Sequence, residues 1–210
     1  MMRLVCVLII WMCTWSVAAQ DMKNVFLAMP DSLTPLLTKV NKEDCIDFLA
    51  SSMKAEVKNR FDQTAEMKML TDDYLQIQMT AKSSLEMKLL PVNDSVKVVC
   101  LIKTVCASVC DSEVHFYTSD WSRKLSTTDY WQCPENDAFY LPMDSITEEY
   151  TLIRKQADLD LMKMSLSKDD TNLSVVYTTP DFLNEENKKN LLPYLRKESL
   201  VYRWENGKFR

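Results

Sequence analysis

The chain has 210 residues, 47% of them hydrophobic, and a formal net charge of −5, a composition typical of a folded globular protein. It has one glycine and one histidine, which excludes glycine-rich phosphate loops, dinucleotide fingerprints and most histidine-based metal sites. The sequence contains no basic stretch suited to neutralising a run of phosphates, so nucleic acid is not an expected partner.

Residues 1–19 have the pattern of an export signal. Arg3 is followed by an apolar stretch up to Val17, and Ala18 and Ala19 supply the small side chains that a signal peptidase requires. The apolar stretch, of about 14 residues, is shorter than the roughly 20 that cross a bilayer as a helix. We therefore expect cleavage after Ala19, contact with a membrane only through this signal, and a mature protein in the periplasm or at the cell surface.

The first half of the processed chain predicts one helix followed by a four-stranded antiparallel meander. Asn41 resembles a helix N-cap, and apolar side chains follow at helical spacing (Cys45, Phe48, Leu49 and Met53). Residues 54–64 are polar and are expected to end this helix or to continue it at the surface. Strand character then recurs between short polar breaks, at residues 74–80, 85–90, 96–106 and 113–118. Residues 96–106 are almost continuously apolar, which predicts a strand covered on both faces at the centre of the sheet.

The second half predicts a similar order of elements. Residues 121–143 are interpreted as a connection with one irregular strand, after which Asp144 resembles the cap of a second helix. Strands are expected at 159–166 and 173–178, then a helix at 184–192, and finally a hairpin around Asn206-Gly207. The predicted fold class is α+β, with antiparallel meander sheets and helices packed on one face, in one domain over residues 20–210. A duplicated helix-plus-four-strand unit, with halves at 25–120 and 144–210, and a plain α+β sandwich both remain open.

Several segments along the chain resemble an uncharacterised family of exported proteins from gut anaerobes of the Bacteroidales type. The segments that carry the resemblance are Met29-Pro30-Asp31-Ser32-Leu33, the helix start Asp44-Cys45-Ile46-Asp47-Phe48, Phe116-Tyr117 followed by Trp121, Tyr177-Thr178-Thr179-Pro180-Asp181, and Tyr202-Arg203-Trp204 with Gly207-Lys208-Phe209. The similarity extends from residue 25 to residue 210. It implies export and a single folding unit, and it supplies no catalytic residue.

Five cysteines remain in the processed chain: Cys45, Cys100, Cys106, Cys110 and Cys133. Cys100 and Cys106 lie on one strand at a separation of about 20 Å, too far apart for a disulfide. Cys106 and Cys110 flank a predicted turn, so they either bridge or remain free buried thiols like the others. The cysteines lack the close pairs of a thiolate metal site, and we predict neither a metal nor a cofactor.

The remaining polar candidates do not form a recognisable catalytic motif. His115 shares a strand face with Glu113 and Tyr117, an arrangement more typical of a structural histidine than of an acid or base. Paired acids occur at predicted turns and helix starts, where carboxylates are solvated and favour the helix dipole (Asp72-Asp73, Glu148-Glu149, Asp169-Asp170 and Glu185-Glu186). No residue is assigned a catalytic role.

The aromatic residues Trp121, Tyr130 and Trp131 lie in the polar connection and are our candidates for contact with a partner, either a protein or a polysaccharide. The alternative is that they fold back and seal the end of the sheet. The sequence favours a non-catalytic envelope or cell-surface protein. A hydrolase acting on envelope or dietary polymers through a carboxylate pair is the alternative, and an inhibitor of a secreted enzyme is a second one.

Overall fold

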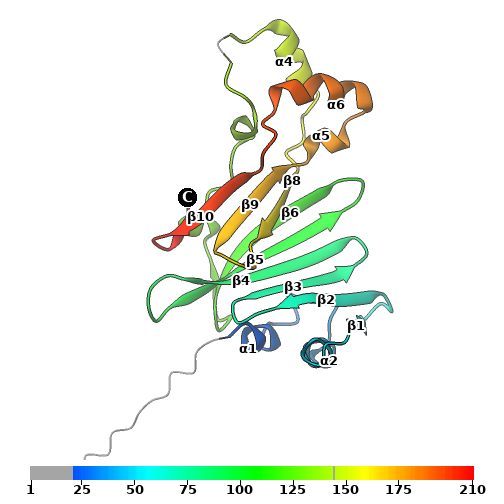
Figure 1. Ribbon diagram of the computed structural model, residues 1–210, viewed down its shortest axis with the longest axis vertical. Coiled ribbons are helices and arrows are strands. Elements are labelled where there is room, and N and C mark those ends of the chain that lie inside the picture. Colours follow the sequence, from blue (N-terminus) through cyan, green and yellow to red (C-terminus); the bar gives the residue numbers. More distant parts are fainter. Residues whose placement is uncertain (1–20, 144) are drawn as a thin grey trace, which may run out of the picture.

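The computed structural model describes residues 21–143 and 145–210 (Figure 1). The predicted export signal and the predicted cap Asp144 lie outside these residues. A seven-stranded antiparallel sheet has two helices on one face and a four-stranded antiparallel sheet on the other. The predicted α+β class with antiparallel sheets is confirmed, although helices cover only one part of the molecule and a second sheet covers the other face.

The large sheet follows the order of the chain, so each strand pairs with its sequence neighbours. Its strands are β1 (Ala55–Lys58), β2 (Thr64–Leu70), β3 (Tyr74–Thr80), β4 (Ser83–Pro91), β5 (Lys97–Cys106), β6 (Cys110–Thr118) and β7 (Lys124–Leu125). The small sheet has the order β11-β10-β9-β8. Its strands are β8 (Met162–Leu166), β9 (Asn172–Tyr177), β10 (Leu200–Glu205) and β11 (Lys208–Phe209).

The helices fall into two groups. Under the large sheet lie α1 (Met22–Leu27) and α2 (Lys39–Ala50). The later part of the chain contains α3 (Thr127–Tyr130), the 3-10 turn η1 (Asn136–Phe139), α4 (Glu148–Lys155), α5 (Thr179–Phe182), α6 (Glu185–Leu191) and the 3-10 turn η2 (Leu192–Tyr194). In Figure 1, α4, α5 and α6 form a small lobe beyond the end of the small sheet. Among the described residues, none of these helices is long and apolar enough to cross a membrane.

Strand β5 shows why the large sheet is covered on both faces. Val99 and Leu101 point into the core shared with α1 and α2. Cys100 and Ile102 point into the second core, which the small sheet completes. Both sets are fully buried, as the continuous apolar run predicts for a doubly covered strand. The middle strand of the seven is β4, so the predicted central strand lies one position away from the centre.

The start of the large sheet differs from the prediction. Helix α2 begins after Thr38, which accepts a hydrogen bond from Asn41 while the Asn41 side chain accepts one from Thr38. Asn41 is therefore the reciprocal partner in a capping box and not the cap. Met53 follows the helix and is 52% exposed. The polar stretch after it forms β1 and leads into β2. The sequence interpretation missed both strands, although their buried positions alternate with charged ones at the two-residue period of a strand.

The second half also departs from a copy of the first. Its sheet has four strands against seven, so the two sheets are not equal units. Helix α4 is capped by Thr147 and not by Asp144, and its buried residues are Tyr150 and Ile153, whereas Ile146 before the cap is 75% exposed. The final hairpin has Asn206 and Gly207 at positive φ (51° and 75°), as its tight turn requires.

Candidate functional site

The three aromatic residues predicted to contact a partner lie in different places. Trp121 is buried in the core of the α1 and α2 face, where its Nε1 donates a hydrogen bond to the Val25 carbonyl at 2.8 Å. Trp131 is buried in the second core, edge-on to Tyr202. Tyr130 is half-buried and borders a hollow at the surface. The two tryptophans therefore seal the sheet, and only Tyr130 presents surface to a ligand.

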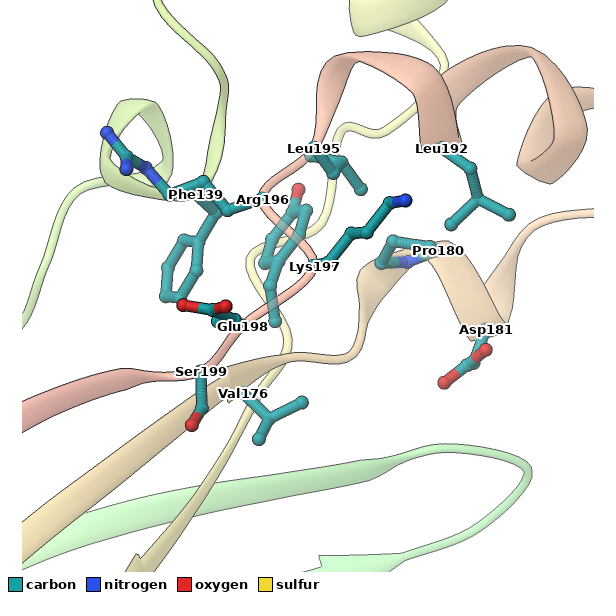
Figure 2. A pocket seen from close by; sticks show the side chains of 11 residues that line it. Phe139, Val176, Pro180, Asp181, Leu192, Leu195, Arg196, Lys197, Glu198 and Ser199 are labelled. Atoms are coloured by element: carbon teal, nitrogen blue, oxygen red, sulfur yellow. The ribbon is translucent and has the colours of Figure 1, made fainter.

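A different hollow lies where the small sheet meets the helical lobe (Figure 2). It encloses about 290 Å3 between the end of β9, α5, η2 and the segment 195–199 that leads into β10. Its lining residues are Phe139, Val176, Tyr177, Pro180, Asp181, Leu192, Leu195, Arg196, Lys197, Glu198 and Ser199. The rings of Phe139 and Tyr177 stack at 5.0 Å with 13° between their planes, which gives the hollow one rigid aromatic wall.

Two further hollows adjoin this one, and Arg196 lines all three. One, of about 290 Å3, lies beside α4 and includes Leu141, Ile146 and Arg154. The other, of about 270 Å3, includes Leu141 and the segment from Arg196 to Leu200. We refer to the three together as the Arg196 groove.

Exposed apolar side chains border the Arg196 groove. Ile146 is 75% exposed, Leu192 is 50% exposed and Leu141 is 44% exposed. Isolated exposed apolar residues are ordinary, but several around connected hollows are typical of a surface that contacts another molecule. The groove thus has the character of an interaction surface.

The charges of the groove are unevenly paired. Asp181 accepts from Lys188 at 2.7 Å, and Arg154 pairs with Asp137. Arg196 and Lys197 are exposed and enter no ion pair among the described residues. Figure 2 shows these two side chains extending in opposite directions from the chain, so they place positive charge on both sides of the segment.

The acids of the groove do not form an evident catalytic centre. Asp181 and Glu198 line the same hollow from different elements, but Asp181 is already bound to Lys188. Residues 21–143 and 145–210 contain no group of three His, Cys, Asp or Glu side chains suited to a metal ion. His115 Nε2 lies 3.2 Å from Glu113 Oε2 on β6, and burial lowers the histidine pKa. This pair lies outside the lining of the groove.

The cysteines occupy distinct positions. Cys106 and Cys110 form a disulfide that closes the β5–β6 hairpin, so the bridged alternative applies to this pair. Cys45 and Cys100 are free and buried, and burial raises the pKa of the Cys45 thiol to about 11. Cys133 is free and exposed.

Sequence reasoning did not single out the groove residues. Phe139 and Tyr177 are 38 positions apart and meet only in the folded chain, and Arg196 lies in a polar stretch that is typical of an ordinary loop. The one available signal is Pro193, which follows the helix predicted at 184–192 and cannot continue it.

Comparison with known proteins places this fold in a family. The model of a family described as "Protein of unknown function (DUF3256)" matches residues 14–209. The chain belongs to the DUF3256 family. A solved structure titled "Structure of a domain of an uncharacterized protein from Porphyromonas gingivalis W83" is 31% identical, with a TM-score of 0.80 over 90% of this chain and 96% of that chain. A search of curated proteins found no match. The resemblance to an uncharacterised family is confirmed, and the description of DUF3256 assigns no activity.

Proposed function

We propose that this protein is an exported, non-catalytic protein of the periplasm or cell surface that binds a segment of another protein in the Arg196 groove. The observation that carries the proposal is the meeting of three hollows at Arg196, bordered by exposed Ile146, Leu192 and Leu141. Apolar anchors and an arginine are the groups that most often contribute binding energy at protein interfaces.

Charge indicates the character of the bound segment. Arg196 and Lys197 have no carboxylate partner among the described residues, and Glu198 is the one unpaired carboxylate beside them, so a segment that carries Asp or Glu next to apolar side chains would complement the excess positive charge. The proposed occupant is therefore a protein segment with acidic and apolar side chains.

Two features support export. The pattern of residues 1–19 is that of a cleaved signal. The Cys106–Cys110 disulfide is compatible with an oxidising compartment, since such bridges are rare in the cytosol. Fractionation of the producing cells, with N-terminal sequencing of the mature protein, tests this part. A first residue of Gln20 in an envelope or secreted fraction is expected, and an intact N-terminus in the cytosol would contradict export.

The binding test compares tagged variants in envelope extracts. Ile146→Asp and Leu192→Asp place charges on the groove rim, and Phe61→Asp serves as the matched control because Phe61 is 71% exposed and lies outside the groove. We expect a specific protein to be recovered with wild type and with the control, and at least tenfold less of it with the groove variants. A synthetic acidic segment of that protein should compete. Equal recovery with all variants contradicts the groove as the binding site.

The same purified protein tests the two alternatives. A hydrolase should release new chain ends from envelope or dietary polysaccharide, and Asp181→Asn and Glu198→Gln should abolish that release. If such turnover occurs, the non-catalytic proposal is wrong. If the recovered partner is a secreted enzyme whose activity falls on binding, the protein is an inhibitor.

A further inference from the structure

Another hollow, of about 310 Å3, lies at the end of the large sheet that carries the β4–β5 and β6–β7 turns. Its lining residues are Val92, Val96, Lys97, Val98, Thr118, Ser119, Asp120, Ser122, Arg123, Leu125 and Tyr130. We refer to it as the Tyr130 hollow. Ligand sites have volumes of about 300 to 1,000 Å3, so this hollow lies near the lower limit. It has room for a single sugar ring and not for several.

The aromatic wall of this hollow is held in place from behind. The Tyr130 ring lies 5.0 Å from the ring of buried Phe116, with 22° between the planes. Trp204 lies 6.2 Å from Tyr130 at 8°, and its Nε1 donates to the Pro91 carbonyl at 2.7 Å. Neighbouring rings and a backbone hydrogen bond hold the Tyr130 and Trp204 side chains in place. Little side-chain entropy would therefore be lost when a ligand binds against them.

The turn opposite Tyr130 presents fixed oxygen atoms. Ser122 donates to Asp120 from its hydroxyl at 2.8 Å and from its backbone N–H at 3.1 Å. Hydrogen bonds from Thr118 and Ser122 lower the pKa of Asp120 to about 2, so its carboxylate is ionised at neutral pH. The Thr118 and Ser122 hydroxyls are 3.2 Å apart. This arrangement offers preformed acceptors and donors for the hydroxyl groups of a sugar.

The charge of the lining favours an anion. Lys97 and Arg123 both line the hollow, and neither enters an ion pair among the described residues. Asp120 is the one carboxylate of the lining, so the lining residues include two cations and one anion. Arginine binds a carboxylate through two parallel hydrogen bonds, which selects an acidic group over a neutral one.

We propose that the Tyr130 hollow binds an acidic sugar unit of a polysaccharide, with the apolar face of the sugar against Tyr130 and its carboxylate on Arg123 and Lys97. The Asp120 turn receives the sugar hydroxyls. This site is separate from the Arg196 groove and does not depend on the function proposed for that groove. It gives the protein a second, saccharide ligand in addition to a protein segment.

The test is isothermal titration of the purified protein with two acidic hexasaccharides, one of galacturonic acid and one of alternating glucuronic acid and N-acetylglucosamine, and with neutral cellohexaose. Wild type should bind at least one acidic hexasaccharide and bind cellohexaose at least tenfold more weakly. Tyr130→Ala and Arg123→Gln should each weaken acidic binding at least tenfold. Lys23→Gln, a change on the exposed side of α1, should bind like wild type.

Circular dichroism of each variant establishes that it is folded. If Tyr130→Ala is unfolded, Arg123→Gln decides the test because its side chain lies at an exposed turn. Lack of binding to both acidic hexasaccharides, equal affinity for cellohexaose, or unchanged affinity of folded Arg123→Gln would each overturn the proposal.

Discussion

The carboxylate of Glu86 on β4 accepts a hydrogen bond from the backbone N–H of Leu166 on β8, at 2.8 Å and across 80 positions of the chain. Two more backbone N–H groups of β8 donate to side chains of the large sheet. The Met162 N–H donates to Asp111 at 3.0 Å, and the Met164 N–H donates to Ser112 at 3.0 Å. β8 is the edge strand of the small sheet. Side chains of the large sheet thus occupy its free N–H groups, which joins the two sheets and blocks pairing with another chain.

Removal of the Glu86 acceptor should destabilise the fold. In Glu86→Ala the buried Leu166 N–H loses its partner, and an unpaired buried donor costs about 1–3 kcal/mol. Glu86→Gln keeps an acceptor oxygen and should lose much less. Urea unfolding at neutral pH measures both. Equal stability of Glu86→Ala and wild type would show that this contact does not join the sheets.

The same carboxyl group predicts a pH dependence. Burial raises the pKa of Glu86 above that of an exposed glutamate, although the hydrogen bond from Leu166 opposes the shift. The folded state therefore holds this proton more tightly than the unfolded state. The stabilisation is complete below the unfolded-state pKa and is lost as pH rises through the raised folded-state pKa. Relative to Glu86→Gln, wild type should lose stability over that window, and urea unfolding from pH 4 to 8 should detect it; parallel curves would contradict the prediction.

Substitutions of Trp121 and Trp131 should lower the stability of the fold, and the two positions should differ in how much stability is lost. Either change to alanine removes a large buried side chain and should cost about 3–5 kcal/mol. Trp121→Phe also breaks the hydrogen bond to the Val25 carbonyl, whereas the Trp131 Nε1 has no partner among the described residues. Trp121→Phe should therefore be less stable than Trp131→Phe by about 1 kcal/mol. Thermal or urea unfolding measures the difference. If Trp131→Phe were the less stable variant, the stabilising role of the Trp121 hydrogen bond would be contradicted.

The cysteines should react in a defined order. Iodoacetamide should label exposed Cys133 in the native protein and should reach Cys45 only after unfolding, because burial also raises its thiol pKa to about 11. Cys106 and Cys110 should require a reductant first. Replacing both with serine should cost about 2 kcal/mol, since the bridge closes a loop of only a few residues. Mass spectrometry of alkylated peptides would reveal a free Cys106 if the bridge does not form.

Gly207 should tolerate a side chain poorly for reasons of backbone conformation. A Cβ added there would lie 3.6 Å from Val92 Cγ1, an ordinary contact, but φ is +75°. Gly207→Ala should cost about 1–2 kcal/mol because a left-handed conformation is unfavourable with a side chain. Lys208→Ala, at an exposed neighbour, is the control and should have little effect in the same unfolding measurement.

Elements that depend on neighbouring residues could be predicted from the sequence. Alternation of apolar and polar side chains placed β3 and β4, a continuous apolar run placed β5, and Asn206-Gly207 placed the last hairpin. These patterns are readable because the backbone repeats every two residues in a strand and because few residues accept positive φ. The antiparallel α+β class follows from the same short breaks between strands.

The neighbours of the polar and aromatic side chains could not be predicted from the sequence, because they come from distant parts of the chain. Burial of Trp121 and Trp131, the contact of Glu86 with β8, and the gathering of three hollows around Arg196 all depend on residues far apart in the chain. Strand β1 alternates over only four residues, and its place in the sheet depends on α2, which covers it, and on β2, which pairs with it. Such contacts leave no local period in the sequence, since their energy comes from surfaces that exist only after the chain has folded.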